Sequence, residues 1–215
     1  GKTKIIIHKS DRNMGGRDFD MALVEKLGGD FASKFGADPR KNTRCVIRML
    51  EAVEKTRKML SSVPDAPINL DYLLEEEDLV ALVTKDEFES LIDPIMRRFR
   101  DLLNRTLLDS GLNADHIHSV EMIGDCTRTP IILDVTKQIF NKTEVFRTLN
   151  SLETVARGAA LQSAMLSPLF SVASFVVEEY NALPVSIQYN FADDGTKNTK
   201  EIFGRGSMFP LTKTV

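Results

Sequence analysis

Apolar residues recur every three or four positions along four stretches of the chain, which is the periodicity of a helix that buries one face. The first stretch is defined by Phe19, Leu23, Leu27, Phe31 and Phe35. Two glycines, at positions 28 and 29, lie inside it. Because glycine costs a helix interior about 1 kcal/mol relative to alanine, the pair leaves room for a break in the helix.

The same spacing predicts three further helices. The first of them begins after Pro39, and its apolar positions are Val46, Met49, Leu50, Val53 and Leu60. A long helix opens at residues 84–87, where Thr and Glu stand three positions apart and can each satisfy a free backbone N–H group. Pro94 within it predicts a kink or a restart. The last helix covers residues 151–165.

Short β-rich runs predict strands between these helices. Residues 2–8 and 117–123 each form one strand, and the runs at 68–72 and 79–84 form a short antiparallel pair. The segment 124–129 is a tight turn, and Pro130 suits the first position of the helix after it. Residues 1–166 therefore have an α/β pattern.

The pattern changes to strands beyond residue 166. Residues 185–190 alternate between apolar and polar side chains, and Asp194 with Gly195 supplies a turn. We place a domain boundary near residues 167–180. The chain starts directly before an apolar run and stops inside what looks like another strand, so we expect a portion of a longer protein.

Composition and charge remove several classes of function. With 42% hydrophobic and 27% charged residues the chain has the composition of a globular protein. A net charge of -3 gives no dense basic face for nucleic acid. No apolar run reaches the length that crosses a membrane, and two cysteines do not suggest a disulfide scaffold. We expect a cytoplasmic protein.

Two constellations could bind a ligand. Glu54, Arg57, Lys58 and Ser61 lie on one face of the second helix, where they could offer an acceptor, a flat cation and a hydroxyl to a nucleoside. Taken alone, the stripe favours a solvated helix face over a ligand site. The turn at 123–130 could bring backbone N–H groups towards an anion, although it also serves as a plain strand–helix connection.

Gly15 and Gly16, before the first helix, have the same two interpretations as that turn. They lack the flanking residues of a P-loop or a dinucleotide fingerprint. His116 and His118 have no third ligand at a suitable spacing, so a surface pair is favoured over a zinc site. Cys126 has no obvious His partner, and we expect neither a catalytic residue nor a metal ligand.

Four motifs, read in order, resemble those of the heat-shock protein 70 family. Residues 14–20 (MGGRDFD) resemble its GG-x-x-FD motif, and residues 53–62 (VEKTRKMLSS) resemble its adenosine-binding helix. Residues 123–130 (IGDCTRTP) are similar to its V-G-G-x-T-R-I-P turn, and residues 149–160 resemble its N-x-D-E-A-V-A-x-G-A-A helix. The segment 161–187 is similar to the large heat-shock protein 110 branch, which lacks the acidic, leucine-rich linker.

The resemblance implies an actin-like ATPase fold. The chain would supply the second lobe over residues 1–166, with a core of 1–36 and 112–166 and an inserted helical and β-hairpin subdomain of 37–111. A linker of 167–182 and the start of an all-β sandwich at 183–215 would follow. The 110 branch implies a nucleotide-exchange factor for heat-shock 70 partners and a holdase for unfolded proteins.

The resemblance also assigns ATP or ADP as the cofactor. Glu54 would meet the ribose with Arg57 close to it, Lys58 and Arg128 would sandwich the adenine, and Ser61 would bind it by a hydrogen bond. Backbone at Gly15, Gly16, Gly124 and Asp125 would approach ribose and phosphates. The phosphate loop, the catalytic lysine and the magnesium-associated aspartates would belong to sequence before Gly1, so this portion alone could not hydrolyse ATP.

Three departures from the family pattern predict weakened nucleotide affinity. Asp125 replaces a glycine beside the phosphates, where a carboxylate ~4 Å from a phosphate would cost up to about 4 kcal/mol at an effective dielectric of 20, and an Asp tolerates positive φ poorly. Leu152 replaces an acidic residue near the ribose, and Arg57 and Lys58 reverse the usual order. These departures leave open a pseudo-ATPase scaffold subunit. An ordinary heat-shock 70 ATPase is disfavoured by the linker.

Overall fold

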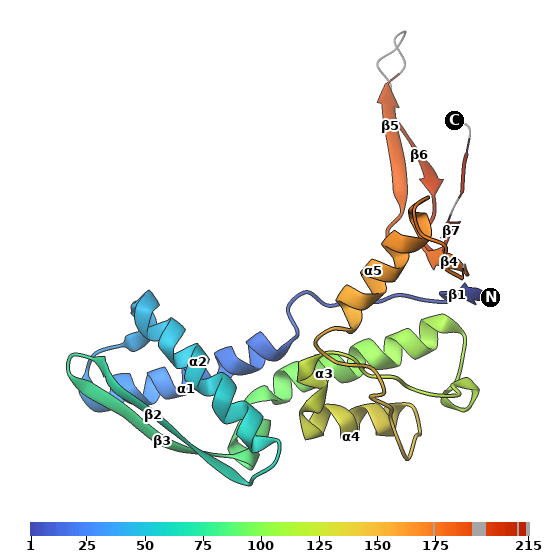
Figure 1. Ribbon diagram of the computed structural model, residues 1–215. Coiled ribbons are helices and arrows are strands. Elements are labelled where there is room, and N and C mark those ends of the chain that lie inside the picture. The colour runs from blue at the N-terminus through green and yellow to red at the C-terminus, as the bar shows by residue number, and fades with distance from the viewer. Residues whose placement is uncertain (174, 191–196, 210, 214–215) are drawn as a thin grey trace. The chain divides into compact units, whose positions relative to one another are not determined.

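The computed structural model describes residues 1–173, 175–190, 197–209 and 211–213 (Figure 1). The chain divides into two compact units. Unit 1 comprises residues 1–10, 105–113 and 153–215. Unit 2 comprises residues 11–104 and 114–152, and it contains all of the candidate ligand-binding residues.

Unit 2 is a helical layer packed on a two-stranded hairpin. Its elements are α1 (Gly16–Phe35), α2 (Thr43–Leu60), β2 (Asp65–Leu74), β3 (Glu77–Thr84), most of α3 (Lys85–Ser110), α4 (Pro130–Ile139) and the 3-10 turns Pro39–Lys41, Ala114–His116 and Asp125–Arg128. The hairpin is antiparallel, with Ala66 opposite Val83 and Ile68 opposite Ala81. The antiparallel pair predicted from the sequence is confirmed.

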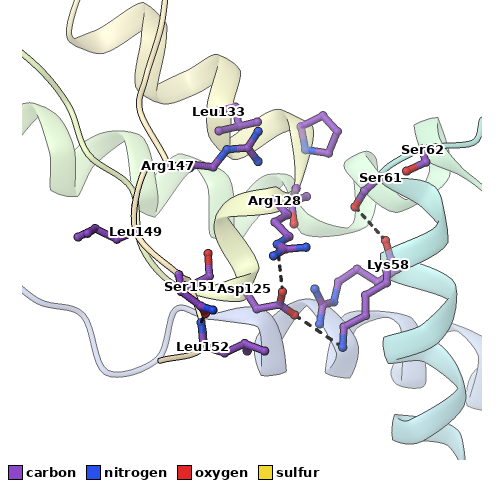
Figure 2. Close-up of a pocket in the computed structure, with 14 residues that line it drawn as sticks. Lys58, Ser61, Ser62, Asp125, Arg128, Leu133, Arg147, Leu149, Ser151 and Leu152 are labelled. Atoms are coloured by element: carbon purple, nitrogen blue, oxygen red, sulfur yellow. Dashed lines mark hydrogen bonds and ion pairs between the residues drawn. The ribbon is translucent and has the colours of Figure 1, made fainter. Parts of the chain in front are cut away.

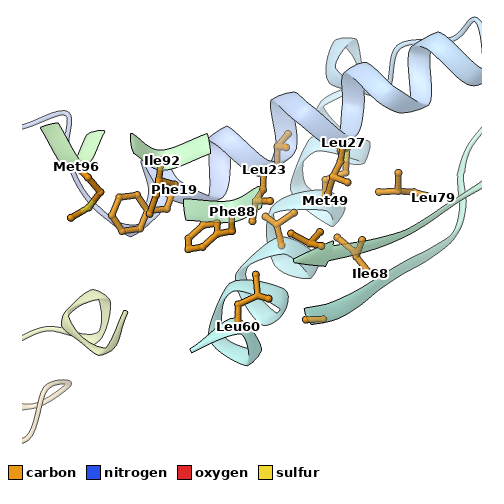
Figure 3. Packing of buried hydrophobic residues seen from close by; sticks show 14 of the residues in the cluster. Phe19, Leu23, Leu27, Met49, Leu60, Ile68, Leu79, Phe88, Ile92 and Met96 are labelled. Carbon is orange, nitrogen blue, oxygen red and sulfur yellow. The ribbon is translucent and has the colours of Figure 1, made fainter. Parts of the chain in front are cut away.

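The core of unit 2 is built from the apolar faces that the periodicity predicts (Figure 3). Leu23 and Leu27 of α1 and Met49 of α2 are almost completely buried, and Ile68 of β2 lies against them. Phe19 and Phe88 meet edge to face, with their ring centroids 6.2 Å apart. This geometry joins the start of α1 to the start of α3, since aromatic pairs favour edge-to-face contact.

The helix α1 runs without interruption through its two glycines. Gly28 is buried, and a Cβ placed on it would come within 2.6 Å of Arg40 Cγ. The side chain of Arg40 is itself held by Asp38 and Glu25. The break that the sequence allowed is therefore absent, because the aliphatic part of Arg40 packs over the glycine and compensates for its low helix propensity.

The other predicted helices are present, with small shifts at their ends. Asn42 caps α2 by accepting hydrogen bonds from the backbone N–H groups of Arg44 and Cys45. Thr84 Oγ1 accepts one from Glu87 N at 3.2 Å, which is one half of the predicted capping arrangement for α3. The helix continues past Pro94, so a restart there is wrong. The final helix, α5, spans Thr154–Leu166 rather than 151–165.

The predicted strand at 117–123 is not formed. One isolated parallel bridge joins Glu121 to Phe146, through hydrogen bonds from Phe146 N to Val120 O and from Met122 N to Phe146 O, both 2.8 Å long. An apolar run becomes a strand only where a second backbone pairs with it along its length. Within the described residues, Phe146 alone provides that pairing here.

Unit 1 contains a small mixed sheet and a second hairpin. Its elements are β1 (Lys2–Lys4), α5, β4 (Val176–Tyr180), β5 (Val185–Asn190), β6 (Lys197–Phe203) and β7 (Met208–Phe209). β1 pairs in parallel with β4, which pairs antiparallel with β7. The predicted strand at 2–8 is thus confirmed only for its first part. β5 pairs antiparallel with β6, but the predicted turn at Asp194 and Gly195 lies outside the described residues.

α1 shares one hydrophobic core with α2 and the β2–β3 hairpin. The predicted division sets a core of 1–36 and 112–166 apart from an insert of 37–111. That division, the linker and the β-sandwich stay predictions. Among the described residues, no helix has both the length and the apolar character needed to span a bilayer.

Candidate functional site

A pocket of about 1030 Å³ opens in unit 2 between the end of α2, the turn before α4 and the loop after it (Figure 2). Its volume suits a ligand the size of a nucleotide. The lining residues are Arg57, Lys58, Ser61, Ser62, Asp125, Arg128, Thr129, Pro130, Leu133, Arg147, Leu149, Asn150, Ser151 and Leu152. The structure therefore brings Arg57, Lys58 and Ser61 of α2 together with Asp125 and Arg128 of the turn, whereas Glu54 and Gly124 are not among the lining residues.

The turn before α4 is shaped by Gly124. Its backbone has φ 96° and ψ 146°, a region that is accessible almost only to glycine. The Gly124 carbonyl accepts hydrogen bonds from Thr127 N at 3.2 Å and Thr127 Oγ1 at 2.6 Å, which close the 3-10 turn. Asp125 is not among the residues with positive φ, so the backbone strain expected at this position is wrong. Pro130 begins α4, as predicted.

Arg57 lines the pocket and is also held by a residue of α1. Its guanidinium donates two hydrogen bonds to the buried Asp20 of α1, from Nε to Oδ1 at 2.7 Å and from Nη2 to Oδ2 at 3.3 Å. Burial lowers the pKa of Arg57, but the hydrogen bonds and charge of Asp20 outweigh it, so that the net shift of this pKa is upward. Because Asp20 holds it, Arg57 orients α2 and only borders the pocket.

Lys58 and Arg128, the pair predicted to sandwich adenine, are connected through Asp125 (Figure 2). Lys58 Nζ lies 3.6 Å from Asp125 Oδ2, and Arg128 Nε lies 3.4 Å from Asp125 Oδ1. Lys58 also binds Glu54 Oε1 at 2.8 Å. The hydrogen bond between them lowers the pKa of Glu54 and raises the pKa of Lys58.

The remaining wall is the loop of residues 147–152, which Glu121 holds in place. Glu121 Oε1 accepts hydrogen bonds from Thr148 N at 2.6 Å, Thr148 Oγ1 at 3.0 Å and Leu149 N at 3.3 Å. Together with the bridge to Phe146, this carboxylate fixes the loop so that exposed Arg147 borders the pocket. Sequence reasoning missed Glu121 and Arg147, since no local motif marks either of them.

Other predicted residues lie outside this pocket. Gly16 and Glu54 line a second cavity of about 500 Å³, which shares Arg57 and Asp125 with the first. Gly15 lines a third, mostly apolar cavity beside α3. Ser61 lines the main pocket and donates a hydrogen bond to Arg57 O at 3.4 Å. Asn150 and Ser151 also line it, and the motif at 149–160 could have identified them.

The charge of the lining favours an anionic ligand. Its cations are Arg57, Lys58, Arg128 and Arg147, and its single carboxylate is Asp125. Leu133, Leu149 and Leu152 add apolar surface against which a planar ring could lie. Within the described part of the chain, no three His, Cys, Asp or Glu side chains gather in a way that could hold a metal ion.

Comparison with known proteins places the chain in one family along nearly its full length. The family described as Hsp70 protein matches residues 1–213. Heat shock 70 kDa protein 16 of Arabidopsis thaliana is 38% identical over 218 residues, covering 100% of this chain and 28% of that protein. The 97 kDa heat shock protein of Strongylocentrotus purpuratus is 32% identical over 99% of this chain and 24% of that protein.

A third relative is the heat shock protein hsp88 of Neurospora crassa, which is 35% identical over 94% of this chain and 29% of that protein. The chain thus spans between 24% and 29% of the length of these relatives. The match over residues 1–213 confirms the resemblance read from the four motifs. The chain belongs to the heat-shock protein 70 family, and its relatives include large heat-shock proteins.

Proposed function

We propose that the pocket between α2 and the Gly124 turn binds the adenosine part of ATP or ADP, in a chaperone of the heat-shock 110 type. The heat-shock protein 70 family is an ATP-binding family with an actin-like ATPase fold. The whole protein would act as a nucleotide-exchange factor for a heat-shock 70 partner and as a holdase for unfolded proteins. Its cytoplasmic location remains a prediction.

The observation that carries the proposal is the meeting of Lys58, Ser61 and Arg128 on one pocket. Lys58 and Arg128 come from opposite walls and could enclose a flat base, because cations pack favourably on π faces. Ser61 supplies a hydroxyl for a ring nitrogen, and Arg147 supplies a guanidinium that suits phosphate oxygens. These residues therefore fit the base and the phosphates of a nucleotide.

A scaffold subunit with weak or lost nucleotide binding is the second candidate. It is favoured by the two ion pairs of Asp125, which partly neutralise Lys58 and Arg128 without any ligand. Leu152, which lies on the pocket wall where the family carries an acidic residue, favours it as well. Both candidates share the fold, and they differ in nucleotide binding and in exchange activity.

Two measurements on the full-length protein test these candidates. Calorimetric titration with ADP and ATP tests binding, and Arg128→Glu should abolish it, whereas Arg97→Glu, at an exposed position of α3 outside the pocket, should not. Addition of the protein to a heat-shock 70 chaperone loaded with fluorescent ADP tests exchange. Accelerated release supports the exchange factor, while release at the basal rate together with absent binding supports the scaffold.

A further inference from the structure

Among the described residues that line the main pocket, Asp125 is the only acidic one. It projects from the same 3-10 turn that carries Arg128, and one carboxylate oxygen faces Lys58 of α2 while the other faces Arg128 (Figure 2). Oδ2 lies 3.6 Å from Lys58 Nζ and Oδ1 lies 3.4 Å from Arg128 Nε. The carboxylate thus lies between the two cations that we propose to enclose the base.

The cations that line the pocket differ in whether they already have an ion-pair partner. Arg57 is held by Asp20 in a buried pair, with side-chain exposures of 8% and 11%. Lys58 is shared between Glu54 and Asp125. Arg147 has no ion pair within the described part of the chain. The phosphates of an incoming nucleotide can therefore use Arg147 directly, but its base must displace Asp125 from between Lys58 and Arg128.

The contacts of Asp125 are weak enough for such displacement. The side chains of Asp125, Lys58 and Arg128 are 38%, 51% and 63% exposed. Water screens charges at such positions, so ion pairs there form and break readily. A displaced carboxylate nevertheless stays in the turn, close to whatever replaces it. Its repulsion increases with the negative charge of the ligand, because the Coulomb energy is proportional to that charge.

We propose that Asp125 is a specificity-determining residue that makes the pocket discriminate against ligand charge, so that adenosine is accepted with less penalty than ADP, and ADP with less than ATP. This inference rests on the proposed function, since it assumes an adenine ligand in the pocket. Asp125 acts as an internal anion that repels the phosphate groups of a bound nucleotide. A neutral side chain of the same shape removes this repulsion and leaves the base-binding walls unchanged.

The test is the affinity of the full-length protein for adenosine, ADP and ATP, measured by calorimetry for the unmodified protein, Asp125→Asn and Asp134→Asn. Asp134 is an exposed residue of α4 that does not line the pocket, so its substitution removes the same charge elsewhere. For Asp125→Asn we expect affinity for ATP to rise about fivefold, for ADP by less, and for adenosine by less than about twofold. Asp134→Asn should change none of them.

Salt supplies an independent readout. Near 1 M salt, where the Debye length is about 3 Å, the gain for ATP should shrink towards the gain for adenosine. An equal gain for all three ligands, or no gain for ATP, would overturn the inference while leaving the pocket a nucleotide site. Absence of binding by every ligand to every variant would overturn the proposed function, and the inference with it.

Discussion

Arg57 of α2 and Asp20 of α1 form a buried, doubly hydrogen-bonded ion pair, with Nε 2.7 Å from Oδ1 and Nη2 3.3 Å from Oδ2. Arg57 borders the candidate pocket, and the pair connects two helices of the unit 2 core. Two parallel hydrogen bonds between a guanidinium and a carboxylate fix their relative orientation. The direction in which α2 presents Lys58 and Ser61 therefore depends on Asp20.

Removal of one partner of this ion pair should lower the free energy of unfolding. Asp20→Asn leaves the Arg57 guanidinium buried without its counter-charge, and we expect a loss of about 3–5 kcal/mol in the free energy of unfolding. The measurement is urea unfolding followed by far-UV circular dichroism. Joint replacement by Asp20→Leu and Arg57→Met should restore much of the loss, because apolar side chains can fill the same space. A double variant as unstable as the sum of the single variants would contradict this interpretation.

Adjacent glycines in α1 provide a matched pair for a second prediction. A Cβ on Gly28 would lie 2.6 Å from Arg40 Cγ and 2.8 Å from Arg40 Cδ, whereas a Cβ on Gly29 would have Arg40 Nη1 as its nearest neighbour at 3.7 Å. Helix propensity alone favours alanine by about 1 kcal/mol at either position. We expect Gly29→Ala to stabilise the chain by up to about that amount, and Gly28→Ala to be neutral or destabilising. Equal stabilisation by both substitutions in urea unfolding would show that Arg40 does not constrain Gly28.

The sequence predicts the features of this architecture that depend on neighbouring residues, but not those that depend on contacts between distant segments. The helix periodicity identified Leu23, Leu27, Met49 and Val53 as apolar positions on helix faces, and these are buried, because burial of one face is a local property of the sequence. The run at 117–123 has the same local β signal as 79–84, but only the latter finds a partner strand within the described residues. Pairing depends on a distant segment, which a local pattern does not reveal.

The candidate site likewise contains residues that local spacing predicts and residues that only tertiary contacts place there. Helical spacing placed Glu54, Arg57, Lys58 and Ser61 on one face, but it could not indicate that Arg57 turns to Asp20, which lies 37 residues away in the sequence. Arg147 was missed because its place depends on the contact of its loop with Glu121, across a comparable separation. Motifs marked Lys58, Ser61 and Arg128, which line the pocket, but also Gly15 and Gly16, which do not, and they gave no signal for Arg147.

The thiol of Cys126 offers a prediction about pH. Burial raises the pKa of Cys126, although the nearby Arg57 guanidinium acts in the opposite direction. We expect alkylation by iodoacetamide at neutral pH to be much slower in the native chain than in urea, because the thiolate is the reactive form. A native rate equal to the rate in urea, corrected for the second cysteine by a Cys45→Ala variant, would contradict a half-buried Cys126 with a raised pKa.

The raised pKa of the Cys126 thiol also makes the free energy of unfolding depend on pH. The folded thiol holds its proton to higher pH than the unfolded thiol does, so its contribution is fully present below the unfolded pKa. That contribution is lost as the pH rises towards and through the folded pKa, because the unfolded chain releases the proton more readily. Cys126→Ala should therefore reduce the decline of the free energy of unfolding at alkaline pH, whereas an unchanged decline would assign it to other groups.

Arg147 is the residue of the pocket wall that we expect to bind the phosphates of the ligand. Its side chain is exposed on the pocket wall, and the described part of the chain offers it no ion pair. If Arg147 binds phosphate oxygens, Arg147→Gln should weaken ADP binding by about tenfold and leave adenosine binding unchanged, because a charge-assisted hydrogen bond is worth roughly 1.5–3 kcal/mol and only part of it survives at an exposed site. Arg157→Gln is a matched control, since its exposed guanidinium lies in unit 1 and pairs with Glu153. Equal loss of adenosine and ADP affinity in Arg147→Gln would indicate that the substitution disturbs the loop held by Glu121 rather than a phosphate contact.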